Sequence, residues 1–505
     1  MTWWRDGVLY QIYPRSWRDA NGDGVGDLEG ILERLDYLAW LGVDGIWLNP
    51  TFPSPNADWG YDVADYLAVD PELGTTGQLE RLVAEAGRRG IRVLLDLVPN
   101  HTSIAHPWFR ERPDYYVWSE RPNNWLSAFG GPAWTFDPER GRYYLHDFLP
   151  EQPDLDWWNE DVRREFDAIL RHWFDRGVAG FRIDVAHRIV KDRFLRDNPP
   201  VTPDDHPHVQ RLGQRQTYTA NQPEVHEVFR RWRRIADAYD PPRLLLGETY
   251  VLDPHELAQF YGAGDELDLA LNFSFLHEPF EAAALRQAVE ATEAALPAHA
   301  WPVWHGSNHD VSRLPTRWCG GDDAKVRCAL LLLLTLRGTA LLYYGDEIGM
   351  RDVTVPAERR LDRVGRDRCR TPMQWDASAG AGFTSAPERA WLPIGRDPAH
   401  TVEAQRGDPG SLLELCRAAI ALRRRSADLR RGAYATVPAP EGVWVFRRGE
   451  RTLVALNLSS REVEVEAPAA RVVLATARER EGERVQRGIR LGPWSGAVVE
   501  TGERA

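Results

Sequence analysis

The sequence predicts an α/β fold, namely a (β/α)8 TIM barrel with an inserted subdomain after strand three and a C-terminal antiparallel β domain. Three observations predict this architecture. Segments with helical apolar spacing that end in glycine lead repeatedly into short apolar runs. Eight such runs occur, and apolar runs bounded in this way are typical of parallel strands buried on both faces. Beyond residue 430 the pattern changes to short runs separated by turn residues.

The repeating unit is clearest in the first half of the chain. Gly42, Gly90 and Gly177 each end a segment with helical spacing, and glycine tolerates the positive φ at which helices stop. No Gly-x-Gly-x-x-Gly turn follows the first run, which argues against the alternative of a doubly wound open sheet. The predicted strands are 8–13, 43–48, 91–97, 178–183, 244–246, 267–272, 303–307 and 340–344.

Two stretches interrupt the alternation. Residues 102–158 are rich in Pro, Trp, Asn and Gly and predict an inserted subdomain, and residues 191–223 predict a long loop. In a barrel both leave from the carboxyl ends of strands, so both can wall a site there. We therefore expect a catalytic barrel in two parts (1–101 and 159–430), with a C-terminal β-sandwich domain at 431–505.

The composition of the chain argues against several classes of function. The chain has 505 residues with 43 % hydrophobic content, which is ample for one large core and a smaller appended domain. A formal net charge of -13 argues against nucleic acid and anionic membrane as partners. The chain opens without a basic region and apolar run, so no secretory signal is expected. The longest apolar stretch, 328–336, is shorter than the ~20 residues of a membrane span and predicts a buried helix.

The cysteines carry little functional information. Cys319, Cys328, Cys369 and Cys416 form no C-x-x-C pair, which indicates neither a zinc site nor a disulfide framework. Free thiols are typical of a reducing compartment, so we expect a cytoplasmic protein. The sequence does not indicate an oligomeric state.

Polar residues gather where the predicted strands end. Arg182-Ile-Asp184 ends the fourth strand, Gly247-Glu248 the fifth and Asn308-His309-Asp310 the seventh. The carboxyl ends of barrel strands form the rim that carries catalytic groups. A single carboxylate there is most simply a structural ion pair, but three from separate strands predict a catalytic cluster.

The neighbours of two carboxylates suggest different roles. Arg182 and Asp184 lie two residues apart on a strand, so they share a face, and the arginine favours an ionised carboxylate suited to a nucleophile. Glu248 follows an apolar run without a basic neighbour in sequence, and a dry site would keep it protonated for general acid work. Such a pair is typical of glycosidases, which hold the carboxyls ~5–5.5 Å apart when retaining and ~6.5–9.5 Å apart when inverting. Sequence does not give this separation.

Four short motifs occur in order, each at the end of a predicted strand. On these motifs the chain resembles the α-amylase superfamily, glycoside hydrolase family thirteen, over nearly its whole length. They are Asp96-Leu-Val-Pro-Asn-His101, Gly180-Phe-Arg-Ile-Asp184, Gly247-Glu-Thr249 and Ser307-Asn-His-Asp310.

The resemblance implies a retaining mechanism without an organic cofactor, in which Asp184 is the nucleophile and Glu248 the acid/base. It implies that Asp310 distorts the sugar and stabilises the oxocarbenium-like transition state. It also implies three residues that bind the attacked glucose, which are His101, Arg182 and His309.

Two further segments resemble the exo-acting α-glucosidase and oligo-1,6-glucosidase branch. They are Asn56-Ala-Asp-Trp-Gly-Tyr-Asp62 and Arg366-Asp-Arg-Cys-Arg-Thr-Pro-Met-Gln-Trp375. The branch resemblance implies that Asp58 and Arg370 close the pocket around the terminal glucose and that Tyr61 stacks beneath it. Without the resemblance, an ordinary turn would be the simpler interpretation of Asp58 and Tyr61.

The segment Asp19-Ala-Asn-Gly-Asp-Gly-Val-Gly-Asp27 begins like a calcium loop, with oxygen-bearing side chains at alternate positions. It departs from the helix-loop-helix version because the twelfth position is Gly30 instead of glutamate. A turn rich in Asp and Asn is the alternative. The branch resemblance implies a structural calcium ion bound by Asp19, Asn21, Asp23, Asp27 and the Val25 carbonyl.

The function expected from these residues is a retaining exo-acting α-glucosidase that hydrolyses terminal non-reducing α-linked glucose from disaccharides and short oligosaccharides. Alternatives are an oligo-1,6-glucosidase and a trehalose synthase or sucrose isomerase-type transglucosidase. A non-catalytic sugar-transport subunit ranks last because such proteins usually lose members of the triad. The cues to linkage conflict. Val185 resembles the α-1,6 pattern, whereas Ala186-His187 resembles some α-1,4 enzymes. Gln152-Pro-Asp-Leu-Asp156 has Asp where the α-1,6 relatives typically carry Asn, and we slightly favour α-1,4 or mixed activity.

Overall fold

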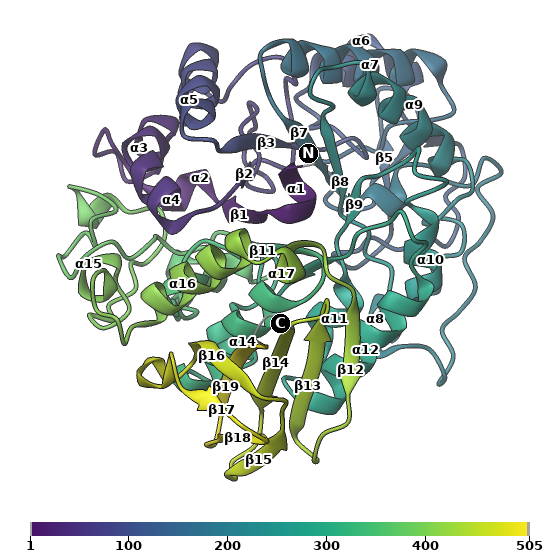
Figure 1. The fold of residues 1–505 in the computed structure, drawn as a ribbon. Coiled ribbons are helices and arrows are strands. Elements are labelled where there is room, and N and C mark those ends of the chain that lie inside the picture. Colours follow the sequence, from purple (N-terminus) through teal and green to yellow (C-terminus); the bar gives the residue numbers. More distant parts are fainter. Residues whose placement is uncertain (1–2, 502–505) are drawn as a thin grey trace.

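The computed structural model describes residues 3–501, and its centre is a parallel eight-stranded barrel (Figure 1). The strand order is β10-β11-β1-β2-β3-β7-β8-β9, and a parallel bridge between Leu271 and Val303 joins the two edges. Each strand overlaps a predicted run, and the predicted barrel fold is confirmed. The strands are β1 (Val8–Ile12), β2 (Gly45–Leu48), β3 (Arg92–Leu97), β7 (Gly180–Ile183), β8 (Leu244–Gly247), β9 (Leu269–Ala270), β10 (Val303–His305) and β11 (Thr339–Tyr343).

The two-residue repeat of the strands divides their side chains between two cores. Leu9, Trp47 and Leu94 pack with each other inside the barrel. Phe181 and Ile183 instead belong to the large outer core that the helices cover. Because both layers are largely apolar, the strands are apolar over most of their length, and this is the pattern from which the sequence predicts them.

Helices surround the barrel (Figure 1). Gly42, Gly90 and Gly177 follow helix ends with φ of 95°, 76° and 87°, a left-handed conformation that favours glycine. The helices are α1 (Trp3–Asp6), α2 (Pro14–Trp17), α3 (Leu28–Glu33), α4 (Leu35–Leu41), α5 (Thr76–Arg88), α6 (Pro107–Glu111), α7 (Glu160–Asp175), α8 (Pro207–Leu212), α9 (Val225–Asp237), α10 (Pro254–Gln259), α11 (Phe273–His277), α12 (Ala282–Ala295), α13 (Leu314–Arg317), α14 (Asp323–Thr335), α15 (Val402–Gln405), α16 (Leu412–Arg425) and α17 (Ala427–Arg431).

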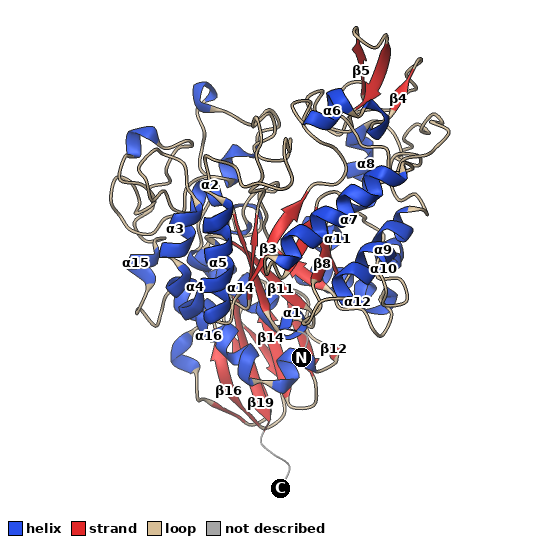
Figure 2. Ribbon diagram, turned by 90° about the horizontal axis from the view of Figure 1, so that it is seen from above, coloured by secondary structure: helices blue, strands red, loops and turns tan. Residues whose placement is uncertain are grey.

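Two excursions from the strand ends build the wall above the barrel. Between β3 and α7 the chain forms a small sheet of β4 (Trp118–Ser119), β5 (Trp134–Asp137) and β6 (Arg142–Leu145), in the order β4-β6-β5. Figure 2 shows β4 and β5 at one end of the molecule and β16 and β19 of the C-terminal sheet at the other. The predicted loop 191–223 is not wholly irregular, because α8 lies within it.

The C-terminal region forms a six-stranded antiparallel sheet, β12-β13-β14-β19-β16-β17, beside a two-stranded sheet of β15 and β18. Alternate residues of its strands serve different cores. Trp444 and Phe446 join the outer core of the barrel, whereas Val443 and Val445 pack in the domain's own core. The strands are β12 (Tyr434–Val437), β13 (Val443–Arg448), β14 (Thr452–Asn457), β15 (Val463–Glu466), β16 (Ala470–Ala475), β17 (Arg484–Val485), β18 (Gly488–Leu491) and β19 (Ser495–Thr501).

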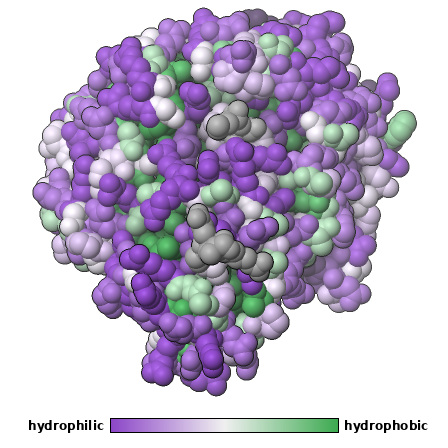
Figure 3. Space-filling model, in the orientation of Figure 1, coloured by the Kyte–Doolittle hydropathy of each residue, from purple (hydrophilic) through white to green (hydrophobic). Residues whose placement is uncertain are grey.

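The described surface is largely polar (Figure 3), and the longest apolar segment is buried. Figure 3 shows a mostly hydrophilic face with small, scattered hydrophobic areas. The apolar stretch 328–336 lies in buried α14 and the turn after it, and no helix in residues 3–501 is long and apolar enough to cross a membrane. All four cysteines are buried and free, while the cytoplasmic location stays a prediction.

Candidate active site

Three predicted carboxylates meet at the rim of the barrel. Asp184 directly follows β7, Glu248 directly follows β8, and Asp310 lies in the turn after β10. All three line a cavity of about 1040 Å³. The cavity wall includes Phe129 and Phe148 of the inserted subdomain. It also includes residues of α8, so both predicted excursions wall the site.

Arg182 links two of these carboxylates. Its Nη1 lies 2.8 Å from Asp184 Oδ1 and 2.7 Å from Asp96 Oδ1, and its Nη2 lies 2.7 Å from Glu248 Oε2. Its side chain is 1 % exposed, so these contacts are shielded from water. Glu248 has no basic neighbour in sequence, but the fold supplies one. A single guanidinium therefore fixes the relative positions of Asp184 and Glu248.

Val185 positions Glu248 through an unusual backbone. Its φ of 36° is left-handed, a conformation that costs a β-branched residue free energy and that concentrates at functional sites. In this conformation the Val185 N–H donates to Glu248 Oε2 over 2.9 Å. With Arg182 on the same oxygen, the Glu248 carboxyl is oriented by two donors.

Tyr61 and His309 form a stacked pair against the barrel interior. Their rings lie 5.3 Å apart with an interplanar angle of 9°, and the Tyr61 hydroxyl is 2.6 Å from His309 Nε2. The same hydroxyl donates to Asp96 Oδ2 over 2.9 Å and accepts from Asn49 Nδ2 over 2.9 Å. Gln11 Nε2 lies 2.9 Å from His309 Nδ1. These contacts hold Tyr61 rigidly where it lines the cavity.

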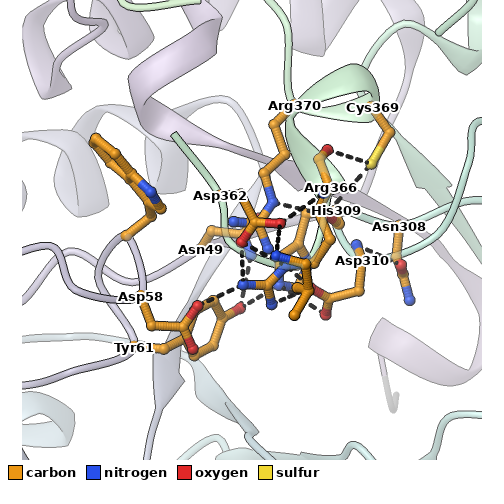
Figure 4. Close-up of polar contacts among 12 residues, drawn as sticks. Asn49, Asp58, Tyr61, Asn308, His309, Asp310, Asp362, Arg366, Cys369 and Arg370 are labelled. Atoms are coloured by element: carbon orange, nitrogen blue, oxygen red, sulfur yellow. Dashed lines mark hydrogen bonds and ion pairs between the residues drawn. The ribbon is translucent and has the colours of Figure 1, made fainter. Parts of the chain in front are cut away.

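The arginine that pairs with Asp58 is not the expected one. Arg366 contacts Asp58, and its Nη1 lies 3.1 Å from Asp310 Oδ1 (Figure 4). Arg370 lies instead behind Asp310, where its Nη2 is 2.8 Å from Asp310 Oδ1 and its Nε donates to the His309 carbonyl. Arg370 is fully buried. The predicted Asp58–Arg370 pair is therefore wrong for this structure, because Arg366 pairs with Asp58 and Arg370 pairs with Asp310.

His101 also lines the cavity, and the buried Gln152 supports it. His101 Nε2 lies 3.0 Å from Gln152 Nε2 and 3.2 Å from the Tyr61 carbonyl. Gln152 also donates to Asp58 Oδ2 over 3.1 Å, so it connects His101 to Asp58. Burial lowers the pKa of His101 to about 3, which keeps the ring neutral at physiological pH. A neutral imidazole can both donate and accept hydrogen bonds from sugar hydroxyls.

The pKa values of Asp184 and Asp310 are shifted in opposite directions. Burial raises the pKa of Asp184 well above 3.8, and although Arg182 opposes this, the nearby Glu248 carboxyl reinforces it. Burial also acts on Asp310, but the positive groups around it, including Arg366 and Arg370, hold its pKa below its usual range. The expectation that Arg182 favours ionised Asp184 is thus only partly met, because three carboxylates share this one arginine.

We expect the raised pKa of Asp184 to determine where kcat/KM falls on the acid side of its pH profile. As pH falls through the raised value the nucleophile is protonated, so the acid limb of kcat/KM should lie above pH 3.8. The Asp96 carboxylate also raises the pKa of Asp184, so Asp96→Asn should move the limb to lower pH. Exposed Asp36, which pairs with Arg89, provides the control Asp36→Asn. A wild-type limb at or below 3.8, or no movement in Asp96→Asn, would contradict this assignment.

Lys191 joins the inserted subdomain to the barrel. Its ammonium lies 2.9 Å from Asp147 Oδ2, 3.0 Å from Asp154 Oδ2 and 2.6 Å from Asn100 Oδ1. The lysine side chain is 3 % exposed. Both aspartates belong to the subdomain, and Asn100 precedes His101 at the rim. A compact ammonium with three donors suits this set of converging oxygens, which a planar guanidinium would match poorly.

We predict that Lys191→Met lowers the free energy of unfolding by about 3–5 kcal/mol, because buried Asp154 loses its cation and buried Asp147 keeps only Arg188. The matched control is Lys325→Met. Lys325 is the other lysine of the chain and lies over the Trp494 ring at the surface, a contact worth about 1 kcal/mol or less. Chemical denaturation of both variants measures the difference. Equal losses would show that the Lys191 contacts do not stabilise the fold.

The predicted calcium loop is closed by its own hydrogen bonds. Asp19 accepts the backbone N–H groups of Asn21, Gly22 and Gly24. Asp23 accepts the Val25 N–H, and Asp27 caps α3 by accepting the Gly30 N–H. Among residues 3–501 no three His, Cys, Asp or Glu side chains gather as a metal site. The donors are nevertheless all oxygen, which is the chemistry that calcium prefers.

The motif residues are recognisable in the sequence, whereas the residues that orient them are not. Nothing in the sequence marks Arg366 as the partner of Asp58, and valine is an unexpected residue for the left-handed position at 185. Lys191, in contrast, could have been noticed from the composition of the chain. The chain has 62 Lys and Arg together, of which only two are lysine, so a lysine close to the motif of strand four stands out.

The assembled site and the barrel were compared with known proteins. The model for the alpha amylase catalytic domain matches residues 11–432, and a domain of unknown function, DUF3459, matches residues 430–498. The chain is 39 % identical to a "Probable alpha-glucosidase" of Rhizobium meliloti (strain 1021), covering 93 % of this chain and 92 % of that protein. It is 34 % identical to an oligo-1,6-glucosidase of Parageobacillus thermoglucosidasius, covering 99 % of each.

Among solved structures, the alpha-glucosyl transfer enzyme XgtA superposes with a TM-score of 0.92 at 38 % identity, covering 99 % of this chain and 100 % of that one. The similarity therefore extends over barrel, inserted subdomain and C-terminal domain together. The chain belongs to the α-amylase family of glycoside hydrolases, in which it is an α-glucoside hydrolase or transglucosidase.

Proposed function

We propose that this protein is a retaining exo-acting α-glucosidase that releases terminal non-reducing α-linked glucose from disaccharides and short oligosaccharides. The observation that carries the proposal is the Arg182 guanidinium, which holds Asp184 on one nitrogen and Glu248 on the other. This arrangement presents two carboxyls to one bond, as glycoside hydrolysis requires.

In the first step Asp184 attacks the anomeric carbon while Glu248 gives a proton to the departing glycosidic oxygen. The C–O bond breaks as the bond to Asp184 forms. Glu248 Oε2 is occupied by Arg182 and the Val185 N–H, so Oε1 is the oxygen that carries the transferred proton. Asp310, kept ionised by its arginines, stabilises the positive charge that develops on the sugar ring.

In the second step water attacks the anomeric carbon of the glucosyl-enzyme. Glu248 accepts the proton of this water, and the bond to Asp184 breaks, which returns both carboxyls to their starting states. His101, Arg182, His309 and Tyr61 bind the glucose in these steps, and Asp58 binds it at the end remote from the reacting bond. Arg370 acts by orienting Asp310.

The proposed linkage is α-1,4, with oligo-1,6-glucosidase activity as the alternative. To test it, purified protein is incubated separately with maltose, isomaltose, sucrose and trehalose, and all products are quantified. Glucose from maltose at a higher kcat/KM than from isomaltose supports the proposal. A preference for isomaltose moves the assignment to α-1,6 bonds, and release of no glucose from any of the four overturns it.

Transglucosylation is the second candidate, and the likeness to the alpha-glucosyl transfer enzyme favours it. A hydrolase and a transferase share the glucosyl-enzyme and differ in whether water or another hydroxyl attacks it. The same incubations distinguish them. A new disaccharide formed faster than free glucose would make transfer or isomerisation the main activity.

Calcium binding by the loop 19–27 is a further proposal, with Asp19, Asn21, Asp23, Asp27 and the Val25 carbonyl as ligands. The ion would be structural, because the loop precedes α3 and none of its residues lines the cavity. A ligand of the folded state raises stability by mass action, so EGTA should lower Tm and added calcium should restore it. Asp23→Asn should weaken this response. A Tm that EGTA leaves unchanged would sink the proposal.

A further inference from the structure

The cavity of about 1040 Å³ continues beyond Glu248, the proposed proton donor to the leaving sugar. The wall of this part comes from α8, from the segment after β8 and from α11. Tyr250 lies at its centre, with its ring stacked on Phe273 at 4.2 Å and on His208 at 4.4 Å between centroids. The Tyr250 hydroxyl also contacts His277 Nε2. We call the part of the cavity bounded by α8, Tyr250 and His277 the outer lobe.

Arg317 places a positive charge in the wall of the outer lobe without an acidic partner. Its guanidinium donates to the carbonyls of Leu276 over 2.8 Å, Gly306 over 2.7 Å and Ser312 over 3.4 Å. No carboxylate forms an ion pair with it among residues 3–501. Burial lowers the pKa of Arg317 to about 10, and distant carboxylates such as Asp346 offset only part of that shift. The group therefore stays charged at physiological pH.

Arg211 adds a second positive charge from α8. Its side chain is exposed and lines the cavity, and its guanidinium makes no hydrogen bond or ion pair within the part of the chain that the structure describes. Burial raises the pKa of Tyr250, and Arg211 and Arg317 both oppose that shift. Burial and the same two arginines lower the pKa of His277 to about 4. Because both arginines act on the same two rings, their charges converge on the outer lobe.

The acidic side chains of the outer lobe are engaged elsewhere. Asp205 is held by Arg215, whose Nε lies 3.0 Å from Oδ1 and 2.9 Å from Oδ2. Asp253 caps the N-terminus of α10. Burial, reinforced by Asp253, raises the pKa of Glu256 on the same helix, which disfavours its charged form. The charge that remains unpaired beside Tyr250 is therefore positive.

We propose that the outer lobe takes a leaving group that carries an anion, either a phosphate or a carboxylate, and that Arg211 binds this anion. The inference rests on the proposed function, since the leaving group fills the outer lobe only if Asp184 and Glu248 cleave the bond before it. A guanidinium offers two parallel N–H groups that match the oxygens of a carboxylate or phosphate. The charge of Arg317 strengthens the positive potential within the cavity walls. A neutral leaving sugar gains from neither group.

Two pairs of substrates test this inference, and the members of each pair differ in one group on the leaving sugar. Maltobionate carries a carboxylate where maltitol carries a hydroxymethyl group. Maltose 1-phosphate carries a phosphate where methyl α-maltoside carries a methoxy group. The initial rate of glucose release is measured for all four. The wild type should show a kcat/KM at least fivefold higher for the anionic member of at least one pair, and that pair identifies the anion.

Arg211→Gln should lower this preference at least threefold, whereas Arg211→Lys keeps the charge and should retain most of it. Added salt should also lower the preference, because dissolved ions screen exposed charges. Arg193→Gln is the matched control. Arg193 is exposed on the same excursion of the chain, does not line the cavity and lies 5.6 Å from the centroid of the Trp158 ring. This control should keep the preference within about twofold of that of the wild type.

A wild type that cleaves the neutral substrates and prefers neither anionic partner overturns the inference and leaves the proposed function standing. A preference that Arg211→Gln retains in full also overturns it, because the anion would then be bound elsewhere. Should Arg211→Gln not fold, a wild-type preference that salt does not lower contradicts the inference. If the wild type releases glucose from none of the four substrates, nor from maltose, the proposed function fails and the inference fails with it.

Discussion

Asp184→Asn is expected to lower kcat for maltose by about four to six orders of magnitude, because removal of a member of a group of catalytic residues that act together costs about that much. An amide is nearly isosteric with the carboxylate, so Arg182 retains a hydrogen-bond acceptor 2.8 Å from its Nη1 and the fold should survive. The amide oxygen is a poor nucleophile toward the anomeric carbon. Steady-state kinetics with product quantification measures the loss.

The matched control for this variant is Asp205→Asn. Asp205 lines the same cavity but pairs with Arg215 on the loop that carries α8. The control should retain kcat within a few-fold. If Asp184→Asn kept more than about a hundredth of wild-type activity, Asp184 would not be the nucleophile, and the other carboxylates of the rim would have to be tested for that role.

Glu248→Gln should have the second-largest effect, and its size should depend on the leaving group. Departure of a sugar needs a proton, so hydrolysis of maltose should fall about 10²–10⁴-fold. Departure of 4-nitrophenolate needs none, so formation of the glucosyl-enzyme from the aryl glucoside should be much less affected. Pre-steady-state kinetics should show a burst of nitrophenol, because water is no longer activated and the intermediate accumulates.

Azide provides the decisive readout for Glu248→Gln, since this anion attacks the glucosyl-enzyme without base catalysis. It should accelerate turnover of the aryl glucoside and yield α-glucosyl azide, because azide displaces Asp184 with a second inversion. Glu256→Gln is the control, because Glu256 lines the same cavity and its nearest polar partner is Asn221 at 3.3 Å. Equal losses on both substrates, without azide rescue, would show that Glu248 is not the acid/base.

The barrel was predictable because its strands are buried on both faces. Leu94 and Leu95 belong to different cores, yet both are apolar, so the run stands out from the amphipathic segments around it. The edges of the strands were less predictable. The run 267–272 yields only two strand residues in β9, because strand limits depend on the hydrogen bonds of neighbouring strands, which a single run does not encode.

The active site also has residues that the sequence predicts and contacts that it does not. Asp184, Glu248 and Asp310 were predictable because each directly follows a strand or lies in the turn after it, within a short motif. The partner of Asp58 was not, since Arg366 and Arg370 lie only four positions apart and the course of their loop decides which one reaches Asp58. The contact between Arg182 and Glu248 joins two neighbouring strands, so it depends on the register of β7 against β8.

The stereochemistry of the first product tests the central claim most directly. Proton NMR of maltose hydrolysis at high enzyme concentration resolves the anomer of newly released glucose before mutarotation mixes the two forms. Double displacement through Asp184 predicts that α-glucose from the non-reducing unit appears first and in excess. Early excess of β-glucose beyond that already present in the reducing unit would mean a single displacement, and Asp184 would then be no covalent nucleophile.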